Sequence, residues 1–241
     1  MASIALTILG TSVTADDPAL PERASLDRVL PLLYDLDNRA IDLAIAQVER
    51  AGQSISCTKG CSACCRAQPV PITPPEALAL AKLVDRLPAE RQAEVRTRFA
   101  HAVARIEQAG QRALLLREEP ITSKEQARAV ARQYFDLKIA RPFLEDDACG
   151  IYTDRPFVCR QYLVTSPAHL CNDPFTNPVK PIDVPLRPAS AMLDVAERYL
   201  GGPQLSVPLT LALEFSARHM QSLQREVPLH EVVSEFAAAL G

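Results

Sequence analysis

The sequence predicts a mainly α-helical protein with an irregular, cysteine-rich metal-binding hub. Apolar residues recur at helical spacing through most of the chain, and few segments alternate as strands do. All seven cysteines lie in two short blocks and in the loop that follows the second block, while the long helical stretches hold none. Thiols that gather in this way are typical of a metal site, because several thiolates must converge within about 2.3 Å of one ion.

Composition narrows the class of protein. The 241 residues suffice to bury a core, so metal is not needed merely for the chain to fold. A formal charge of −3, a pI near 5.9 and the lack of Trp argue against a general nucleic-acid binder. No segment approaches the roughly 20 apolar residues that cross a bilayer, so no membrane partner is expected. The odd number of cysteines, with no basic residue before Arg23, favours a cytoplasmic location over secretion.

The N-terminal part divides into a lead and a helix. Residues 1–22 lack a clear period and are predicted to be a flexible lead or a strand-like arm. Residues 23–241 are predicted to form a single helical domain. From Ser25 an apolar stripe at helical spacing begins, with Pro31 in the first turns, where proline is tolerated. Gly52 ends this helix just before the first cysteine block.

Start signals mark three helices between the cysteine blocks. Residues 69–72 are too rich in proline for a helix and are predicted to be extended. Thr73, followed by proline and by Glu76, forms a capping box that starts a helix to about residue 87. A charged, Ala-rich second helix is predicted for 88–119. Ser123 caps a third helix, which ends near residue 138.

The last part of the chain combines a long loop with three further helices. Residues 167–188 are dense in Pro and Asn, which predicts a loop long enough to be functional rather than a mere connection. Helices are predicted for 190–200, 209–224 and 230–240. The predicted hub is formed by two irregular stretches, about 55–72 and about 146–172.

The first cysteine block holds Cys57, Cys61, Cys64 and Cys65. On a helix or a run of tight turns these sulfurs fall within roughly a 100° arc, so further ligands must come from the second block. The adjacent pair diverges by the same angle, so one of the two serves a second ion or stays unligated. The first three cysteines match the spacing of the radical S-adenosylmethionine motif, but Ala63 stands where that family carries an aromatic residue, and its strand–helix barrel is not predicted. Cysteines in such a block could also be buried structural thiols or form disulfides.

Positive side chains flank both blocks. Lys59 and Arg66 accompany the first block, and Arg155 and Arg160 the second. Four thiolates on Zn²⁺, or on a cluster core of charge 2+, leave about −2, which such cations would offset. Six thiolates on a single divalent ion would leave about −4, so full occupancy favours a cluster or two ions.

Taken together, the two blocks resemble the YkgJ-type cysteine-cluster family, also described as a CxxCxxCC zinc- or iron-chelating domain. The resemblance covers about residues 50–165 and rests on the first block, on 70–76 and on the spacing of Cys149, Ile151, Tyr152, Arg155, Pro156, Cys159, Arg160 and Tyr162. The first gap has three residues instead of two. The resemblance implies metal or iron–sulfur binding without a defined reaction. A related cluster in flagellin lysine-N-methylases opens an enzymatic possibility, but methyl transfer is not carried over, because no glycine-rich nucleotide loop is found.

The sequence therefore predicts a metal-binding protein that holds an iron–sulfur cluster or zinc. Compact spacing favours zinc, whereas the number of cysteines and the flanking cations favour iron. The predicted ligands are Cys57, Cys61, Cys64, Cys65, Cys149 and Cys159, and Cys171 and His169 are possible further ligands. The function could also be that of an enzyme that uses the centre for redox or methylase-like protein-modifying chemistry, or that of a structural zinc interaction module.

Overall fold

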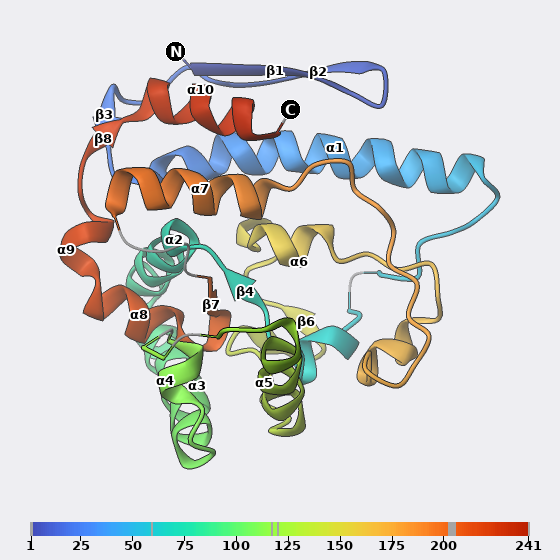
Figure 1. Cartoon of the computed structure of the whole chain (residues 1–241), viewed down its shortest axis with the longest axis vertical. Helices are drawn as coiled ribbons and strands as arrows, with labels where there is room; N and C mark the ends of the chain where they lie inside the picture. The colour runs from blue at the N-terminus through green and yellow to red at the C-terminus, as the bar shows by residue number, and fades with distance from the viewer. Residues whose placement is uncertain (1, 59, 117, 120, 202–205, 241) are drawn as a thin grey trace.

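A computed structural model describes residues 2–58, 60–116, 118–119, 121–201 and 206–240 of the chain. The protein is mainly helical, as the sequence predicts (Figure 1). In the part that is described, no helix is both long enough and apolar enough to span a membrane. The α-helices are α1 (Leu30–Arg50), α2 (Pro74–Asp85), α3 (Ala89–Gln108), α4 (Arg112–Leu115), α5 (Lys124–Asp136), α6 (Phe157–Gln161), α7 (Pro188–Leu200), α8 (Ala212–Arg218), α9 (Met220–Leu223) and α10 (Leu229–Leu240). Single 3-10 turns form η1 (Leu26–Val29), η2 (Ala63–Arg66), η3 (Tyr152–Asp154), η4 (Ala168–Asn172) and η5 (Leu209–Leu211).

Of the two alternatives predicted for residues 1–22, a flexible lead or a strand-like arm, the structure shows strands, because residues 2–17 form a β-hairpin. Strands β1 (Ala2–Ile8) and β2 (Thr11–Asp17) pair antiparallel, and Leu9 and Gly10 form the turn with positive φ angles of 50° and 78°. Alternate side chains of the hairpin, such as Ile4, are buried in one core with α1 and α10. Every second residue of the hairpin is buried only because distant helices cover one of its faces. The sequence of the hairpin does not show these helices, so its short alternating pattern alone does not predict it.

The remaining strands are two residues long and form antiparallel pairs in the segments between helices. They are β3 (Arg23–Ala24) with β8 (Val227–Pro228), β4 (Pro71–Ile72) with β7 (Val207–Pro208), and β5 (Leu144–Glu145) with β6 (Ala148–Cys149), all antiparallel.

The helix starts predicted at Thr73 and Ser123 are confirmed, and two predicted helices are divided, 209–224 into η5, α8 and α9 and 88–119 into α3 and α4. The Glu76 carboxylate accepts hydrogen bonds from the Thr73 N–H (2.8 Å) and hydroxyl (2.9 Å), and the Ser123 hydroxyl accepts one from the Gln126 N–H (3.1 Å). The helix predicted for 88–119 ends with α3, because Gly110 adopts a φ of 67° that reverses the chain before α4.

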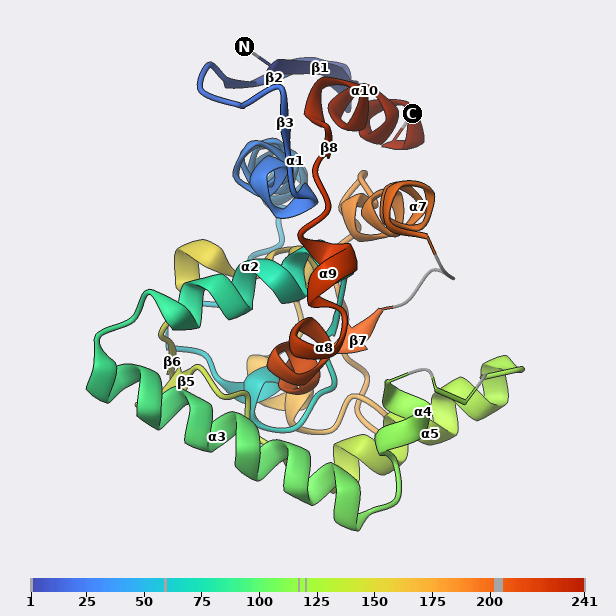
Figure 2. The same cartoon turned by 90° about the vertical axis from the view of Figure 1, so that its left-hand side faces the viewer.

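Two apolar cores lie in successive layers. The hairpin, α1, α7 and α10 surround the first core, and α2, α3, α5 and α8 contribute to the second. Figure 2 shows the order of the layers, from the hairpin and α10 through α1 and α7 to α2 and α8, with α3 at the far side. The short helix α6 joins the cores, because Phe157 is buried in the first while Val158 and Cys159 pack against the second.

A carboxylate of α1 is buried between these layers with incomplete hydrogen bonding. Asp37 is 1% exposed; its Oδ1 accepts a hydrogen bond from Gln161 Nε2 (2.7 Å), while Oδ2 has no partner among the described residues. Burial raises the pKa of Asp37 to about 7, against the lowering effects of the Gln161 bond and the Arg160 charge and with a further rise from Glu76. The carboxyl group therefore binds its proton more tightly in the folded chain than in the unfolded one, and stability is lost as the pH rises through about 7.

Asp37→Asn is expected to remove this pH dependence. Between about pH 5 and pH 8 the variant should gain about 2–3 kcal/mol of unfolding free energy relative to the wild type, because the carboxyl of the unfolded chain is ionised while the buried one keeps its proton up to about pH 7. Urea unfolding at the two pH values measures the difference. Asp42→Asn, which removes an exposed carboxylate from the same helix, is the matched control and should show no such change. An effect of Asp37→Asn that is equal at both pH values would contradict the prediction.

Candidate functional site

The first cysteine block is a run of tight turns. The Cys61 N–H donates to the Thr58 carbonyl (2.9 Å), and the Cys65 N–H donates to the Ser62 carbonyl (2.8 Å). The second of these turns opens η2, which carries both adjacent cysteines. The block therefore brings its sulfurs together through successive reversals of the chain and not through one helical face.

A hairpin presents the first cysteine of the second block. Between β5 and β6, Asp146 and Asp147 adopt φ angles of 44° and 59°. Positive φ at both central residues is the backbone of a type I′ turn, and aspartate tolerates it better than most residues do. This turn ends on β6, whose last residue is Cys149.

Helix α6 presents the second cysteine of that block, Cys159. The N–H of Phe157, the first residue of α6, donates to Glu76 Oε1 (2.7 Å). The start of α6 is thus anchored to the capping box of α2. Because the Phe157 ring is fully buried on one side of the helix, Cys159 is directed to the other side.

Hydrogen bonds hold the two blocks together. Asp147 Oδ1 accepts from the Ser62 hydroxyl (2.6 Å) and from the Arg66 guanidinium. Deeper in the structure, the Arg141 N–H donates to the Cys65 carbonyl (2.9 Å). The first block is therefore fixed at two points, to the turn of the β5–β6 hairpin and to Arg141, which precedes that hairpin.

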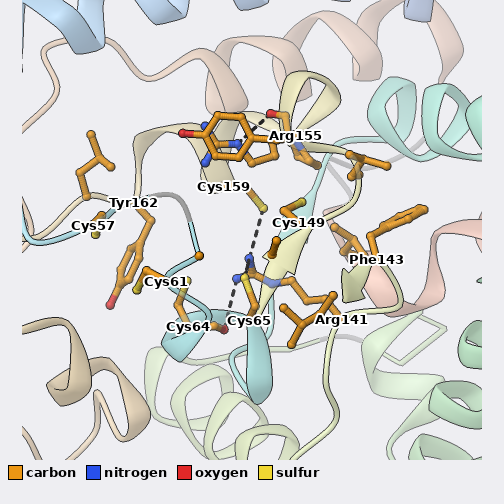
Figure 3. A pocket seen from close by; sticks show the side chains of 18 of the residues that line it. Cys57, Cys61, Cys64, Cys65, Arg141, Phe143, Cys149, Arg155, Cys159 and Tyr162 are labelled. Carbon is orange, nitrogen blue, oxygen red and sulfur yellow. Dashed lines mark hydrogen bonds between the residues drawn. The ribbon is translucent and has the colours of Figure 1, made fainter. Parts of the chain in front are cut away.

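All six predicted cysteines line one cavity of about 120 Å³, called the cysteine cavity below (Figure 3). Each of these cysteines is half-buried and free of disulfides. Apolar side chains, among them Phe143, Leu144, Ile151 and Leu209, form much of the remaining wall. The cavity is smaller than the roughly 300–1,000 Å³ of typical organic-ligand sites. Its size and donor atoms therefore suit an ion or a small inorganic group better than an organic cofactor.

A guanidinium group lies among the sulfurs. Arg141 Nη1 donates to Cys65 Sγ (3.2 Å) and to Cys159 Sγ (3.7 Å), so it contacts both blocks. Sequence reasoning missed this residue, because Arg141 lies outside both blocks and no motif marks it.

Burial and this cation act on the thiols in opposite directions. Burial raises the pKa of Cys159 to about 11, although the charge of Arg141 lowers it. The pKa of Cys64 is lowered to about 6, mainly because the Cys65 thiol donates a hydrogen bond to it and further because of Arg141, while burial opposes the shift. As the donor of that bond, Cys65 has a raised pKa. Protonated thiols must release their protons to bind a cation, so acid should weaken such binding.

The six sulfurs do not converge on one point. Across the described residues, no group of three or more His, Cys, Asp or Glu side chains is placed to hold a metal ion. Figure 3 shows Cys57 and Cys61 on the Tyr162 side of the cavity, away from Cys149 and Cys159. Coordination of one ion by three or more thiolates therefore requires side chains to move inward.

The two possible further ligands, Cys171 and His169, lie outside this cavity. Cys171 is buried in η4, where the Tyr162 hydroxyl hydrogen-bonds to its sulfur and Gln68 Nε2 donates to its carbonyl (2.9 Å). His169 is exposed. The structure therefore separates Cys171 from the six cysteines by the side chain of Tyr162, which itself lines the cavity.

The predicted flanking cations have different environments. Arg155 lines the cysteine cavity and stacks its guanidinium on the Tyr152 ring at 3.6 Å. Arg160 turns away from the cysteines and donates to two backbone carbonyl groups. Arg66 pairs with a carboxylate at the edge of the site, and Lys59 lies outside the described residues.

A second cavity, of about 480 Å³, lies against the other side of α6. Thr153, Asp154 and Arg160 line it together with Tyr34 and Glu76. Cys159 and Arg160 are adjacent in sequence, yet they face different cavities. The loop predicted to be functional, 167–188, contributes to neither cavity.

In comparisons with known proteins, no family model, no curated protein and no solved structure matches the chain. Its function is therefore inferred from its residues and their arrangement alone.

Proposed function

We propose that this chain is a metal-binding protein in which the six cysteines of the cysteine cavity hold an iron–sulfur cluster or zinc. One observation carries the proposal. Cysteines from two blocks far apart in the sequence line a single small cavity. Scattered structural thiols have no reason to meet in this way, whereas metal ligands must.

The donor set supports a thiophilic metal. Thiolates select zinc and iron–sulfur clusters, while Mg²⁺ and Ca²⁺ prefer oxygen ligands. The carboxylate of Asp147, two residues before Cys149, is already engaged by Ser62 and Arg66. A hard cation therefore has little support here.

The number of cysteines favours a cluster or two ions over a single zinc ion, since one zinc ion takes four thiolates. Six thiolates on one divalent ion would leave about −4, which the guanidinium of Arg141 alone would not offset. A bound cluster would supply electron transfer, and bound zinc would supply Lewis acidity or pin the surrounding loops. The residues that would hold either group are the same.

We also propose membership of the YkgJ-type cysteine-cluster family. The spacing within and between the two cysteine blocks supports it, together with the sequence that follows the first block. The test of this proposal is the same as the test of the metal centre, because metal or iron–sulfur binding is what the family resemblance implies.

The second cavity favours an enzyme as a second candidate function. Its volume of about 480 Å³ lies within the range of small-molecule sites, and it shares α6 with the cysteine cavity. A ligand of this cavity should raise the unfolding temperature of the wild type but not that of Ala79→Phe, which would fill the space. If no ligand does so while bound zinc stabilises the fold, the structural zinc module is favoured instead.

The first test is metal and acid-labile sulfide analysis of protein purified without oxygen, together with its visible spectrum. We expect coloured protein with iron and sulfide in matched amounts. Colourless protein with stoichiometric zinc would assign the site to zinc. Protein with neither metal and with all seven thiols free would refute the proposal.

A further inference from the structure

Arg141 donates four hydrogen bonds, all of them to cysteines. Its N–H donates to the Cys65 carbonyl (2.9 Å), Nη2 donates to the Cys64 carbonyl (3.4 Å), and Nη1 donates to the sulfurs of Cys65 (3.2 Å) and Cys159 (3.7 Å). The residue thereby joins the first cysteine block to α6 of the second. No other described arginine has a hydrogen bond to a cysteine sulfur.

The charge of Arg141 has no carboxylate partner among the described residues. Other arginines of the chain pair with Asp or Glu, as Arg98 does with Glu145 and Arg112 with Glu214. The guanidinium of Arg141 instead contacts the sulfurs of Cys65 and Cys159, and Arg141 lines the cavity that also holds Cys64 and Cys149. Its Nε is buried and makes no hydrogen bond to any residue that the structure describes. A cation that is partly withdrawn from water costs free energy unless an anion compensates it, and in the metal-bound protein the neighbouring anions would be thiolates.

We infer that Arg141 is the positioning and charge-balancing residue of the cysteine cavity. This role rests on the proposed function, because thiolates are present in number only when a metal or cluster is bound. Four thiolates around a divalent centre leave about −2, and one guanidinium offsets half of it. Hydrogen bonds to ligand atoms also fix their orientation and tune the metal.

The planar guanidinium matters as well as the charge. Nη1 of the guanidinium donates to the sulfurs of Cys65 and Cys159, while Nη2 donates to the Cys64 carbonyl. A lysine ammonium carries the same charge on a single nitrogen, so it keeps the electrostatic contribution and loses part of the bridge.

Arg141→Gln and Arg141→Lys test this role in the full-length protein. Zn²⁺ affinity is measured by competition with a chelator, and Co²⁺ serves as a spectroscopic probe of thiolate ligation. Arg141→Gln is expected to lower the Zn²⁺ affinity by about 10- to 100-fold and to shift the thiolate-to-cobalt absorption. Arg141→Lys should recover part of the affinity, which a role in packing alone would not predict.

Arg105→Gln is the matched control. Arg105 is also half-buried and donates to a backbone carbonyl near the end of α5, that of Leu137 (2.6 Å), but it contacts no sulfur. Arg105→Gln should change the Zn²⁺ affinity by less than about threefold. This is below the 10- to 100-fold loss that is typical when a hydrogen-bond partner of a metal ligand is removed. Circular dichroism establishes that each variant is folded.

The outcomes separate the two proposals. If the wild type binds none of Zn²⁺, Co²⁺ or iron, the proposed function fails and the role of Arg141 fails with it. If the wild type binds metal and Arg141→Gln binds it equally well, only the role of Arg141 is refuted. Tighter binding by Arg141→Gln would also overturn this role, because the guanidinium would then compete with the metal.

Discussion

Cys159→Ser is expected to leave the purified protein with less than about a tenth of the wild-type metal, a loss at least as large as that for outer-shell residues. Serine preserves the size of the side chain, but its hydroxyl stays protonated near neutral pH and is a poor ligand for a thiophilic metal. Cys159 is held in place, because the Phe157 N–H bond to Glu76 fixes the start of its helix. Metal and sulfide analysis, normalised to protein, measures the effect.

Cys171→Ala is the control for this substitution. Cys171 is 4% exposed and lies outside the cysteine cavity, so its removal should leave the metal content close to that of the wild type. Equal loss of metal from both variants would mean that the six proposed cysteines are not the correct set of ligands. Retention of metal by Cys159→Ser would remove α6 from the centre.

Local signals predict the helices, and long-range packing decides what the sequence does not reveal. The caps at Thr73 and Ser123 depend on residues within one turn, so they can be predicted from the sequence. The structure confirms both. Gly110 ends α3 within a stretch predicted as one continuous helix, because its backbone conformation outweighs the helix-favouring residues around it. The hairpin at residues 2–17 depends on α1 and α10, which cover one of its faces.

The same distinction applies to the candidate site. Clustering of cysteines in two blocks is enough to predict that they surround one site, and all six line one cavity, although their sulfurs do not converge on one point. The place of Arg141 follows from no pattern, since its contacts with Cys65 and Cys159 join three separate segments of the chain. The flanking Arg160 is predicted to balance the cysteines, but its guanidinium is used by backbone carbonyls on the other side of α6.

Glu76 shows how a cap that is predictable from sequence also supports the site. Its capping bonds to Thr73 involve Oε2, while Oε1 accepts from the Phe157 N–H (2.7 Å) and from the Tyr34 hydroxyl (3.4 Å). The side chain is fully buried, and burial raises its pKa. One carboxyl group therefore links the start of α2, the start of α6 and α1.

Glu76→Ala is expected to lower the unfolding free energy of the metal-free protein by about 3 kcal/mol or more. Each buried donor that loses its acceptor costs about 1–3 kcal/mol, and two of the four are backbone N–H groups that have no ready substitute. Release of a buried carboxyl group offsets part of this loss, but breaking such a network from one side is strongly destabilising. Urea unfolding in the presence of a chelator measures the change without a contribution from bound metal.

Glu90→Ala provides the matched control, because Glu90 also lies in the first turn of a helix, α3, but is exposed. Its substitution should change stability by no more than about 0.5 kcal/mol. A loss below about 1 kcal/mol for Glu76→Ala would mean that water or a neighbouring group replaces the carboxylate at the start of α6. If the loss is as large as expected, metal affinity should fall as well, since the helix that carries Cys159 would no longer be anchored to α2.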